Sequence, residues 1–280
     1  MLLKLNNIRL YMHNNIKIIL AGLLISACSP KVVSKKQTLY GERVLKVMSY
    51  NIHHANPPSK SKEGIIDIDA VAAVILKQQP DLVGIQETDK GTKRRGNINE
   101  AALLGQKTGM HAQFFKAIDY DGGDYGLTIL SHYPIQSFSK VNLPQAMKGE
   151  ARILSYITVN IPGKGKLTFA NTHLDATHPD SNRIVQMKRI IAELSSKQGP
   201  VIIVGDFNSE ASKEPIRILD QHFRRTCVNG CAFTIPELRP NKTIDYIAIK
   251  NADWLVLGHT VIPETYASDH RPVVATFQLK

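Results

Sequence analysis

The chain has 280 residues, of which 43% are hydrophobic and 21% charged, and its formal net charge is +11. It carries no internal repeat and no low-complexity block, which excludes repeat and low-complexity architectures. Three basic residues and no acidic residue fall within the first 27 positions, which leaves the remaining chain with a charge of +8. This excess favours anionic surfaces or substrates such as phosphates, nucleic acid or acidic lipid.

The first 27 residues resemble a signal peptide. Lys4, Arg9 and Lys17 precede the apolar run IILAGLLI, which at about eight residues is too short to span a bilayer but suits a signal-peptide core. The following LISAC resembles a bacterial lipobox, in which Cys28 becomes the lipid-bearing first residue. Met12 is an alternative start, and an ordinary cleaved secretory leader is the alternative to lipidation. We therefore expect the mature chain to be lipid-anchored to a bacterial membrane in the cell envelope, facing the periplasm or the surface.

The rest of the chain divides into a short tether and one domain. Residues 28–42 are polar and basic and are expected to link the lipid to the globular part. Residues 43–280 are long enough for a single domain with a sizeable core.

Secondary structure is expected in mixed order. Short runs rich in β-branched residues predict strands over Leu45–Asn51, Leu82–Gln86, Leu127–Ser131, Ile153–Asn160, Leu167–Asn171, Val201–Val204, Ile244–Ile249 and Val273–Phe277. Helical spacing predicts helices over Asp69–Gln78, Asn99–Thr108 and Ser181–Ser195. Several strands between residues 127 and 171 follow one another without a helix, so part of the sheet should be antiparallel. No glycine fingerprint follows the first strand, which argues against a Rossmann fold.

Polar side chains stand at the ends of six of these strands. They comprise Asn51, Glu87, His173 with Asp175, Asp206 with Asn208, Asp245, and Asp269 with His270. Ordinary turns would draw equally on Ser, Gly and Lys. Oxygen-rich ligands suit a hard divalent ion such as Mg²⁺, and imidazole beside carboxylate suits proton transfer or the stabilisation of developing charge.

The chain resembles the endonuclease/exonuclease/phosphatase superfamily, the DNase I-like hydrolases of phosphate esters. The resemblance rests on eight segments in the family's order, covering about residues 44–278: MSYNIHH, GIQETD, YGLTILSHYPI, EARILSYITV, NTHLD, VIIVGDFNS, KTIDYI and ASDHRPV. It implies an α/β fold, a four-layer sandwich of two mixed β-sheets packed face to face with helices on the outer sides. The site would lie at one rim of the two sheets.

The resemblance also implies roles for individual residues. Glu87 would be the main carboxylate ligand of Mg²⁺, with Mn²⁺ as the alternative ion, helped by Asn51 and Asp269. His270, held by Asp245, would face the scissile phosphate. Asp206 would position or deprotonate the attacking water, although the family leaves either Asp206 or His270 as the base.

Further residues support the same phosphate. Asn208 would hydrogen-bond the phosphate or the metal ion, His173 matches a histidine that contacts the phosphate in the DNase I and sphingomyelinase branches, and the Tyr125 hydroxyl would support the same group. Glu150 and Arg152 match a family pair that is usually buried near the site.

Three arginines are candidate substrate contacts. Arg94 and Arg95 lie in GTKRRG, which reads as a solvated loop; the alternative is that the two arginines grip anionic groups distant from the reacting phosphate. Arg183 opens a helix near His173 and would reach a phosphate or cover the core with its stem. His53, His54, His111 and His222 have no motif role and are read as surface or hydrogen-bonded residues, with substrate contact by His53 or His54 as the alternative.

Cys227 and Cys231 are the remaining thiols. In an oxidising compartment they would either close a small loop around Asn229-Gly230 or stay free.

Three functions follow from the resemblance. The first is an Mg²⁺-dependent diesterase acting on a lipid or sugar-phosphate head group, as in the sphingomyelinase-like branch and in proteins that remodel glycosylphosphatidylinositol lipids. The second is an envelope-bound nuclease. The third is a non-catalytic lipoprotein that uses the fold for binding. No protein partner is implied.

Overall fold

A computed structural model describes residues 44–280 of the chain. The expected leader, Cys28 and tether therefore lie outside the described residues. Within residues 44–280, no helix is long and apolar enough to cross a membrane.

Two six-stranded sheets form the centre of the fold. The first sheet has the order β11-β12-β1-β2-β4-β3 and the second the order β5-β6-β7-β8-β10-β9. Their strands are β1 (Val44–Asn51), β2 (Leu82–Lys90), β3 (His111–Tyr120), β4 (Gly123–Ser131), β5 (Ile135–Asn142), β6 (Ile153–Ile161), β7 (Gly165–His173), β8 (Val201–Asp206), β9 (Arg224–Arg225), β10 (Asp245–Lys250), β11 (Leu255–Val261) and β12 (Val273–Gln278). Both sheets are mixed, because β1 with β2 and β7 with β8 run parallel while the other pairs are antiparallel.

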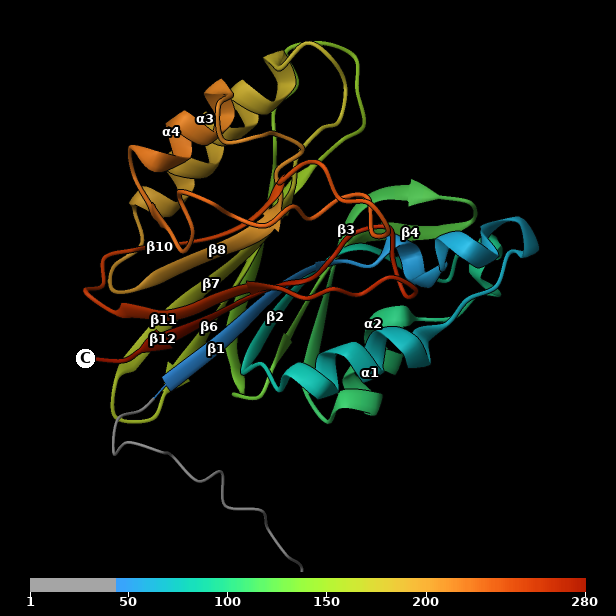
Figure 1. Ribbon diagram of the computed structural model, residues 1–280, viewed down its shortest axis with the longest axis horizontal. Coiled ribbons are helices and arrows are strands. Elements are labelled where there is room, and N and C mark those ends of the chain that lie inside the picture. Colours follow the sequence, from blue (N-terminus) through green and yellow to red (C-terminus); the bar gives the residue numbers. More distant parts are fainter. Residues whose placement is uncertain (1–43) are drawn as a thin grey trace, which may run out of the picture. The chain divides into compact units, whose positions relative to one another are not determined.

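Helices cover the outer face of each sheet (Figure 1). They are α1 (Ile68–Gln78), α2 (Glu100–Thr108), α3 (Ser181–Ser195) and α4 (Glu214–Asp220). One apolar core fills the space between the sheets, a second packs α1 and α2 on the first sheet, and a third packs α3 and α4 on the second sheet. This four-layer α/β sandwich confirms the expected fold class.

Local chemistry explains where the helices begin. The Asp67 side chain accepts a hydrogen bond from the Ala70 N–H at the start of α1, and Asn99 does the same for Ala102 at the start of α2. Such side-chain caps satisfy backbone donors that the first helical turn leaves without partners. In α3, Met187, Ile191 and Leu194 are buried on one face, as the helical spacing predicts.

Strand register brings the polar strand ends together. His173 and Asp245 both pair with Asp206, across the parallel β7–β8 ladder and the antiparallel β8–β10 ladder. In the other sheet, Asn51 pairs with Gln86, which immediately precedes Glu87. One rim of the sandwich therefore collects side chains from five different strands.

Cys227 and Cys231 form a disulfide. Of the two expectations for these residues, the closed loop around Asn229-Gly230 is the one that the structure confirms.

Candidate active site

Asp206 is the centre of the polar rim. It ends the buried strand β8, and only 1% of its surface is exposed. Its Oδ2 atom lies 3.0 Å from Asn51 Nδ2, 3.5 Å from His173 Nε2 and 3.6 Å from His270 Nε2. Burial and the nearby Asp245 charge raise the pKa of Asp206. A carboxylate whose pKa is moved toward neutrality is well matched to proton transfer near pH 7.

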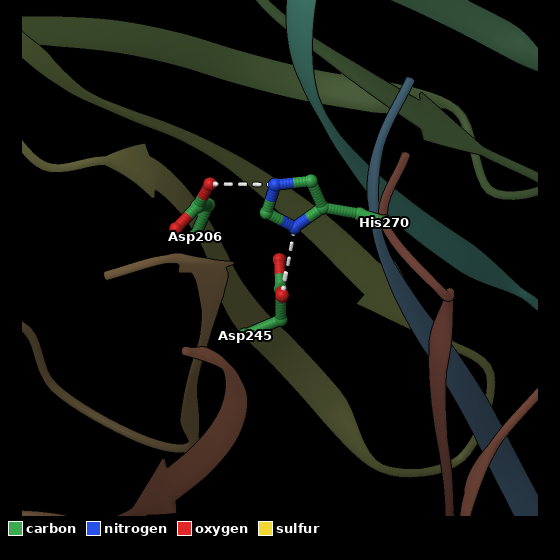
Figure 2. A group of neighbouring side chains, drawn as sticks. All are labelled: Asp206, Asp245 and His270. Carbon is green, nitrogen blue, oxygen red and sulfur yellow. Dashed lines mark hydrogen bonds and ion pairs between the residues drawn. The ribbon is translucent and has the colours of Figure 1, made fainter. Parts of the chain in front are cut away.

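His270 forms a hydrogen-bonded pair with Asp245 (Figure 2). The distance from His270 Nδ1 to Asp245 Oδ2 is 2.9 Å, and the opposite ring nitrogen faces Asp206. Burial by itself would lower the pKa of His270, but the carboxylates of Asp245 and Asp206 outweigh it and raise the pKa well above its ordinary value. The imidazole is therefore held in a fixed orientation in its charged form.

His173 has the opposite electrostatic character. Its Nδ1 atom lies 3.1 Å from Arg152 Nη1, and a guanidinium can only donate, so Nδ1 accepts. The remaining proton then resides on Nε2, which faces Asp206. Burial and the Arg152 charge lower the pKa of His173 well below its ordinary value. The site thus contains one charged and one neutral imidazole.

Glu87 occupies an unusual backbone position. The pairing of β2 with β4 shifts register between Ile85 and Thr88, and Glu87 itself has a φ of 59°. A left-handed conformation is costly for a residue other than glycine and is concentrated at functional positions. The resulting β-bulge re-aims the Glu87 side chain, whose Oε1 accepts a hydrogen bond of 3.0 Å from Asn51 Nδ2.

The donor set around Glu87 fits a hard cation. Asn51 Nδ2 donates to Glu87 Oε1 and to Asp206 Oδ2 at 3.0 Å, and Asn51 Oδ1, the atom that could ligate a cation, accepts from the His53 N–H at 3.0 Å. Burial by itself would raise the pKa of Glu87, but His54, His173 and Asn51 outweigh it and hold the pKa well below its ordinary value, so the carboxylate stays ionised. Ionised carboxylate and amide oxygens are the ligands that Mg²⁺ prefers. Asp269 is partly exposed, and Ser268 Oγ donates to its Oδ1 at 3.3 Å and to the Asn51 carbonyl at 2.7 Å.

Ligand atoms of Asp206, Asp245 and His270 also lie within 4.8 Å of one another, a spacing that could hold an ion. An ion at this position would compete with the proton and the hydrogen bond of His270. His270 Nδ1 is already bonded to Asp245, and an imidazole that is charged has no lone pair left for a metal.

Asn208 and Tyr125 lie beside this group. The Asn208 N–H donates to Asp206 Oδ1 at 2.9 Å and the Asn208 side chain donates to the Leu174 carbonyl, so Asn208 orients the carboxylate with its backbone. Asn208 has a left-handed φ of 46°. Tyr125 is buried next to Glu87, and burial together with the Glu87 charge raises its pKa well above the ordinary value.

The three arginines expected to contact substrate differ in their exposure to the site. Arg94 lines a cavity that Glu87 also lines. Arg95 is buried, and its guanidinium makes one hydrogen bond to the described residues, to the Arg94 carbonyl. Arg183 is 1% exposed, and its guanidinium bonds to Asp180 and to the carbonyls of Asp175 and Thr177. The structure therefore brings Arg94 to the site and leaves Arg95 and Arg183 in the interior.

Two other expectations need correction. The GTKRRG segment is only partly solvated, because Thr92 and Arg95 are buried while Lys93 and Gly96 are exposed, and Lys93–Arg95 form a 3-10 turn. The pair Glu150 and Arg152 is joined by an ion pair of 3.0 Å, but only Arg152 is buried, since the Glu150 side chain is 40% exposed.

Sequence reasoning missed His54. Its Nδ1 lies 3.4 Å from Glu87 Oε2, and it belongs to a run of left-handed residues, His53 to Ala55, that begins two positions after Asn51. His53 instead faces the Asn56 carbonyl. The available signal for a position near the site was that His54 lies in the MSYNIHH segment, three residues after Asn51.

Comparison with known proteins gives a consistent result. The sequence profile described as the endonuclease/exonuclease/phosphatase family matches residues 48–270. No curated protein matches the chain significantly.

Solved structures share the fold. An endonuclease/exonuclease/phosphatase from Beutenbergia cavernae is 23% identical, with a TM-score of 0.68 over 85% of this chain and 72% of that one. A second, from Bacteroides vulgatus, is 19% identical, with a TM-score of 0.70 over 85% of this chain and all of that one. A mannosyl-6-phosphatase from Bacteroides thetaiotaomicron is 18% identical, with a TM-score of 0.66 over 82% of this chain and 98% of that one.

Proposed function

Because the chain belongs to the endonuclease/exonuclease/phosphatase family, and so to the phosphoric ester hydrolases, we propose that it is an Mg²⁺-dependent diesterase acting on a lipid or sugar-phosphate head group. The observation that carries this proposal is the convergence on Asp206, whose Oδ2 atom meets Asn51, His173 and His270 within 3.6 Å. These groups can activate water on one side of a phosphate and supply hydrogen-bond donors on the other.

Each group has a distinct part in hydrolysis. Asp206 takes the proton of the attacking water, because its raised pKa makes it a competent base. His270 is already protonated beside Asp245, so it acts as a donor to a phosphoryl oxygen and stabilises developing charge. His173 donates from Nε2 as a neutral imidazole. The division of charge between the two imidazoles favours Asp206 over His270 as the base.

Glu87 and the amide oxygen of Asn51 would hold the metal ion, with Asp269 as a further oxygen donor. When bound there, Mg²⁺ supplies Lewis-acid stabilisation of charge on the phosphate. Asn51 also donates to Asp206, so it couples the metal position to the base. Asn208 keeps the Asp206 carboxylate oriented through its backbone N–H.

Three observations bear on the choice between the candidate functions: a structural relative, the net charge and the presence of the proposed catalytic and metal-binding residues. A mannosyl-6-phosphatase is among the structures with this fold, which is consistent with a sugar-phosphate substrate. An envelope-bound nuclease is the second candidate, because the chain beyond residue 27 carries a charge of +8, which suits the nucleic-acid backbone. A purely binding function is disfavoured, since Glu87, Asp206 and His270 are all present.

A direct assay tests the enzyme proposal. The purified full chain should hydrolyse bis-p-nitrophenyl phosphate with Mg²⁺ and lose this activity when a chelator is added. A lack of turnover on any phosphate ester, together with a lack of Mg²⁺ binding, would refute it. Plasmid DNA, RNA, sphingomyelin and phosphoinositides should then be compared, and nicking of DNA far faster than any lipid would favour the nuclease.

We also propose that residues 1–27 are a leader and that lipid on Cys28 anchors residues 43–280 to a membrane through the tether 28–42. Anchoring would hold the site near lipid or at the cell surface. A Cys28→Ala variant should move from the membrane fraction to the soluble fraction after cell lysis. Retention of that variant in the membrane fraction would remove Cys28 as the anchor.

A further inference from the structure

A small cavity opens beside Glu87. It has a volume of about 110 Å³ and is lined by His54, Glu87, Arg94, Tyr120, Tyr125 and Glu150. Pockets for drug-sized ligands have volumes of about 300 Å³ or more, so this cavity suits one ring or one head group. We call it the head-group cavity.

Arg94 is held rigidly at the wall of the head-group cavity. Its Nε and Nη2 atoms donate to the two oxygens of the buried Asp89 at 2.7 and 2.9 Å. Its backbone N–H donates to Asp121 Oδ2 at the tip of the β3–β4 hairpin, which fixes the 3-10 turn against that hairpin. Within residues 44–280, Arg94 Nη1 makes no hydrogen bond or ion pair. A guanidinium that is oriented in advance, with one edge free, loses little entropy when it binds a ligand.

The two tyrosines of the cavity are already in contact with this cation. The guanidinium carbon of Arg94 lies 4.2 Å from the centre of the Tyr120 ring and 5.6 Å from that of Tyr125. A quaternary ammonium such as choline would need those ring faces and would meet a positive charge there. The cavity is therefore poorly suited to phosphocholine.

The carboxylates of the cavity do not make it a binding site for an ammonium group. Glu150 is paired with Arg152 at 3.0 Å, and Glu87 is the proposed metal ligand. Neither presents an uncompensated negative charge to an ammonium group. The Glu150 side chain is nevertheless 40% exposed and can accept hydrogen bonds from hydroxyl groups.

We propose that the head-group cavity selects phosphate esters of polyols, either a hexose or an inositol, over esters of choline. Hydroxyl groups of the ring would donate to Glu150 and accept from Arg94 Nη1, while the phosphate occupies the position next to Asp206. This inference rests on the proposed function and specifies the substrate class of the same site.

Binding of head-group phosphates tests the proposal without turnover. The Asp206→Asn variant of the full chain, which should not turn over substrate, should be titrated by NMR with myo-inositol 1-phosphate, glucose 1-phosphate and phosphocholine in the presence of Mg²⁺. We expect at least one of the two polyol phosphates to bind at least about 10-fold more tightly than phosphocholine, as one good polar contact would give. The polyol phosphate that binds more tightly shows whether the cavity prefers an inositol or a hexose ring. Phosphocholine binding as tightly as both polyol phosphates, or more tightly, would overturn the proposal.

Variants assign the preference to Arg94. Arg94→Ala should abolish the preference for the polyol phosphate. This change leaves Asp89 buried without its partner, so the double variant Arg94→Ala/Asp89→Asn should be measured beside it, because it removes both charges together. Arg217→Ala, which truncates an exposed arginine of α4, is the matched control and should keep the preference. An unchanged preference in the folded double variant would overturn the role of Arg94.

The assay with bis-p-nitrophenyl phosphate separates the two levels of proposal. That substrate carries neither polyol nor choline, so its hydrolysis reports only on the hydrolytic function. Hydrolysis of this substrate without any head-group preference would refute the role of the cavity and leave the hydrolytic function standing.

Discussion

Arg152 Nη1 lies 3.1 Å from His173 Nδ1, and this contact determines which nitrogen of His173 carries the proton. Because a guanidinium has no acceptor, Nδ1 must be the lone-pair atom and Nε2 the donor. The same contact places a positive charge beside the ring. His173 is thereby kept neutral within the same group that keeps His270 charged.

Removal of the Arg152 charge should therefore change how His173 titrates. In the wild type, burial and Arg152 lower the pKa of His173, so its ring should remain neutral down to well below pH 6.5. In Arg152→Met the pKa should move up toward the ordinary value of about 6.5, and kcat/KM should fall about 10-fold or more. NMR of ¹⁵N-labelled histidine measures both the tautomer and the titration.

Arg189→Met, on the exposed side of α3, controls for the loss of an arginine. A His173 ring that is already charged at pH 6.5 in the wild type would contradict the assignment.

Asp206→Asn should reduce turnover of bis-p-nitrophenyl phosphate by at least about 100-fold, because an amide cannot accept the proton of water. Asp69→Asn, an 81% exposed acid on α1, is the matched control and should retain full activity. Near-normal turnover in Asp206→Asn would remove this residue from the proposed site, provided that thermal unfolding shows both variants to be folded.

His270→Ala should also reduce turnover by at least about 100-fold, because the charged donor to the phosphate is lost. Initial rates at saturating substrate measure this effect. The exposed His222→Ala serves as the control. If His270→Ala retained most of its turnover, the donor role would have to pass to another group.

Glu87→Gln should weaken metal binding. Replacing the ionised carboxylate with a neutral amide removes the main charge that attracts the cation, so the Mg²⁺ concentration for half-maximal activity should rise at least about 10-fold. Calorimetric titration with Mg²⁺ measures the same loss without turnover. Glu63→Gln, an exposed substitution, should leave the affinity unchanged. Equal Mg²⁺ affinity in Glu87→Gln and wild type would place the ion elsewhere.

Glu100 should make the stability of the fold depend on pH. Burial raises its pKa from 4.5 to about 8, so the folded protein keeps this carboxyl protonated where the unfolded chain ionises it. The stability that Glu100 contributes is thus complete below pH 4.5 and is lost as the pH rises through about 8.

The isosteric Glu100→Gln stays neutral and still accepts the Asp89 N–H through its carbonyl oxygen. Between pH 6 and pH 9, the Tm of the wild type should therefore fall more than that of the variant, by about 3 °C or more. Parallel Tm curves for the two proteins would show that Glu100 is already ionised in the folded protein at pH 6, so that burial does not raise its pKa.

The sequence predicted the buried strands and the long helices because their signals are local. Val201–Val204 is an uninterrupted aliphatic run, and α3 repeats its apolar residues at helical spacing. The strands β3, β5 and β11 were missed because they lie at or next to the edges of the sheets and expose many of their residues, which leaves them without a continuous apolar run. The helix α4 has only seven residues, too few for a periodic pattern.

By itself, the sequence determined that oxygen-bearing and imidazole side chains follow buried strands, and hence that a polar site should form at their ends. That inference needs only the chain order, because a strand that is buried must deliver its next residue to the rim of the sheet. It also identified the residues that meet at Asp206 through their ordered motifs.

Only the tertiary structure decided which partner each side chain has. Arg152 meets His173 across 21 positions of sequence, and His54 meets Glu87 through a β-bulge and a run of left-handed residues. Arg94 faces a cavity while Arg95, its neighbour, is buried, because the 3-10 turn rotates adjacent side chains in different directions. These outcomes depend on strand register and on the packing between distant segments, and a short stretch of sequence contains neither.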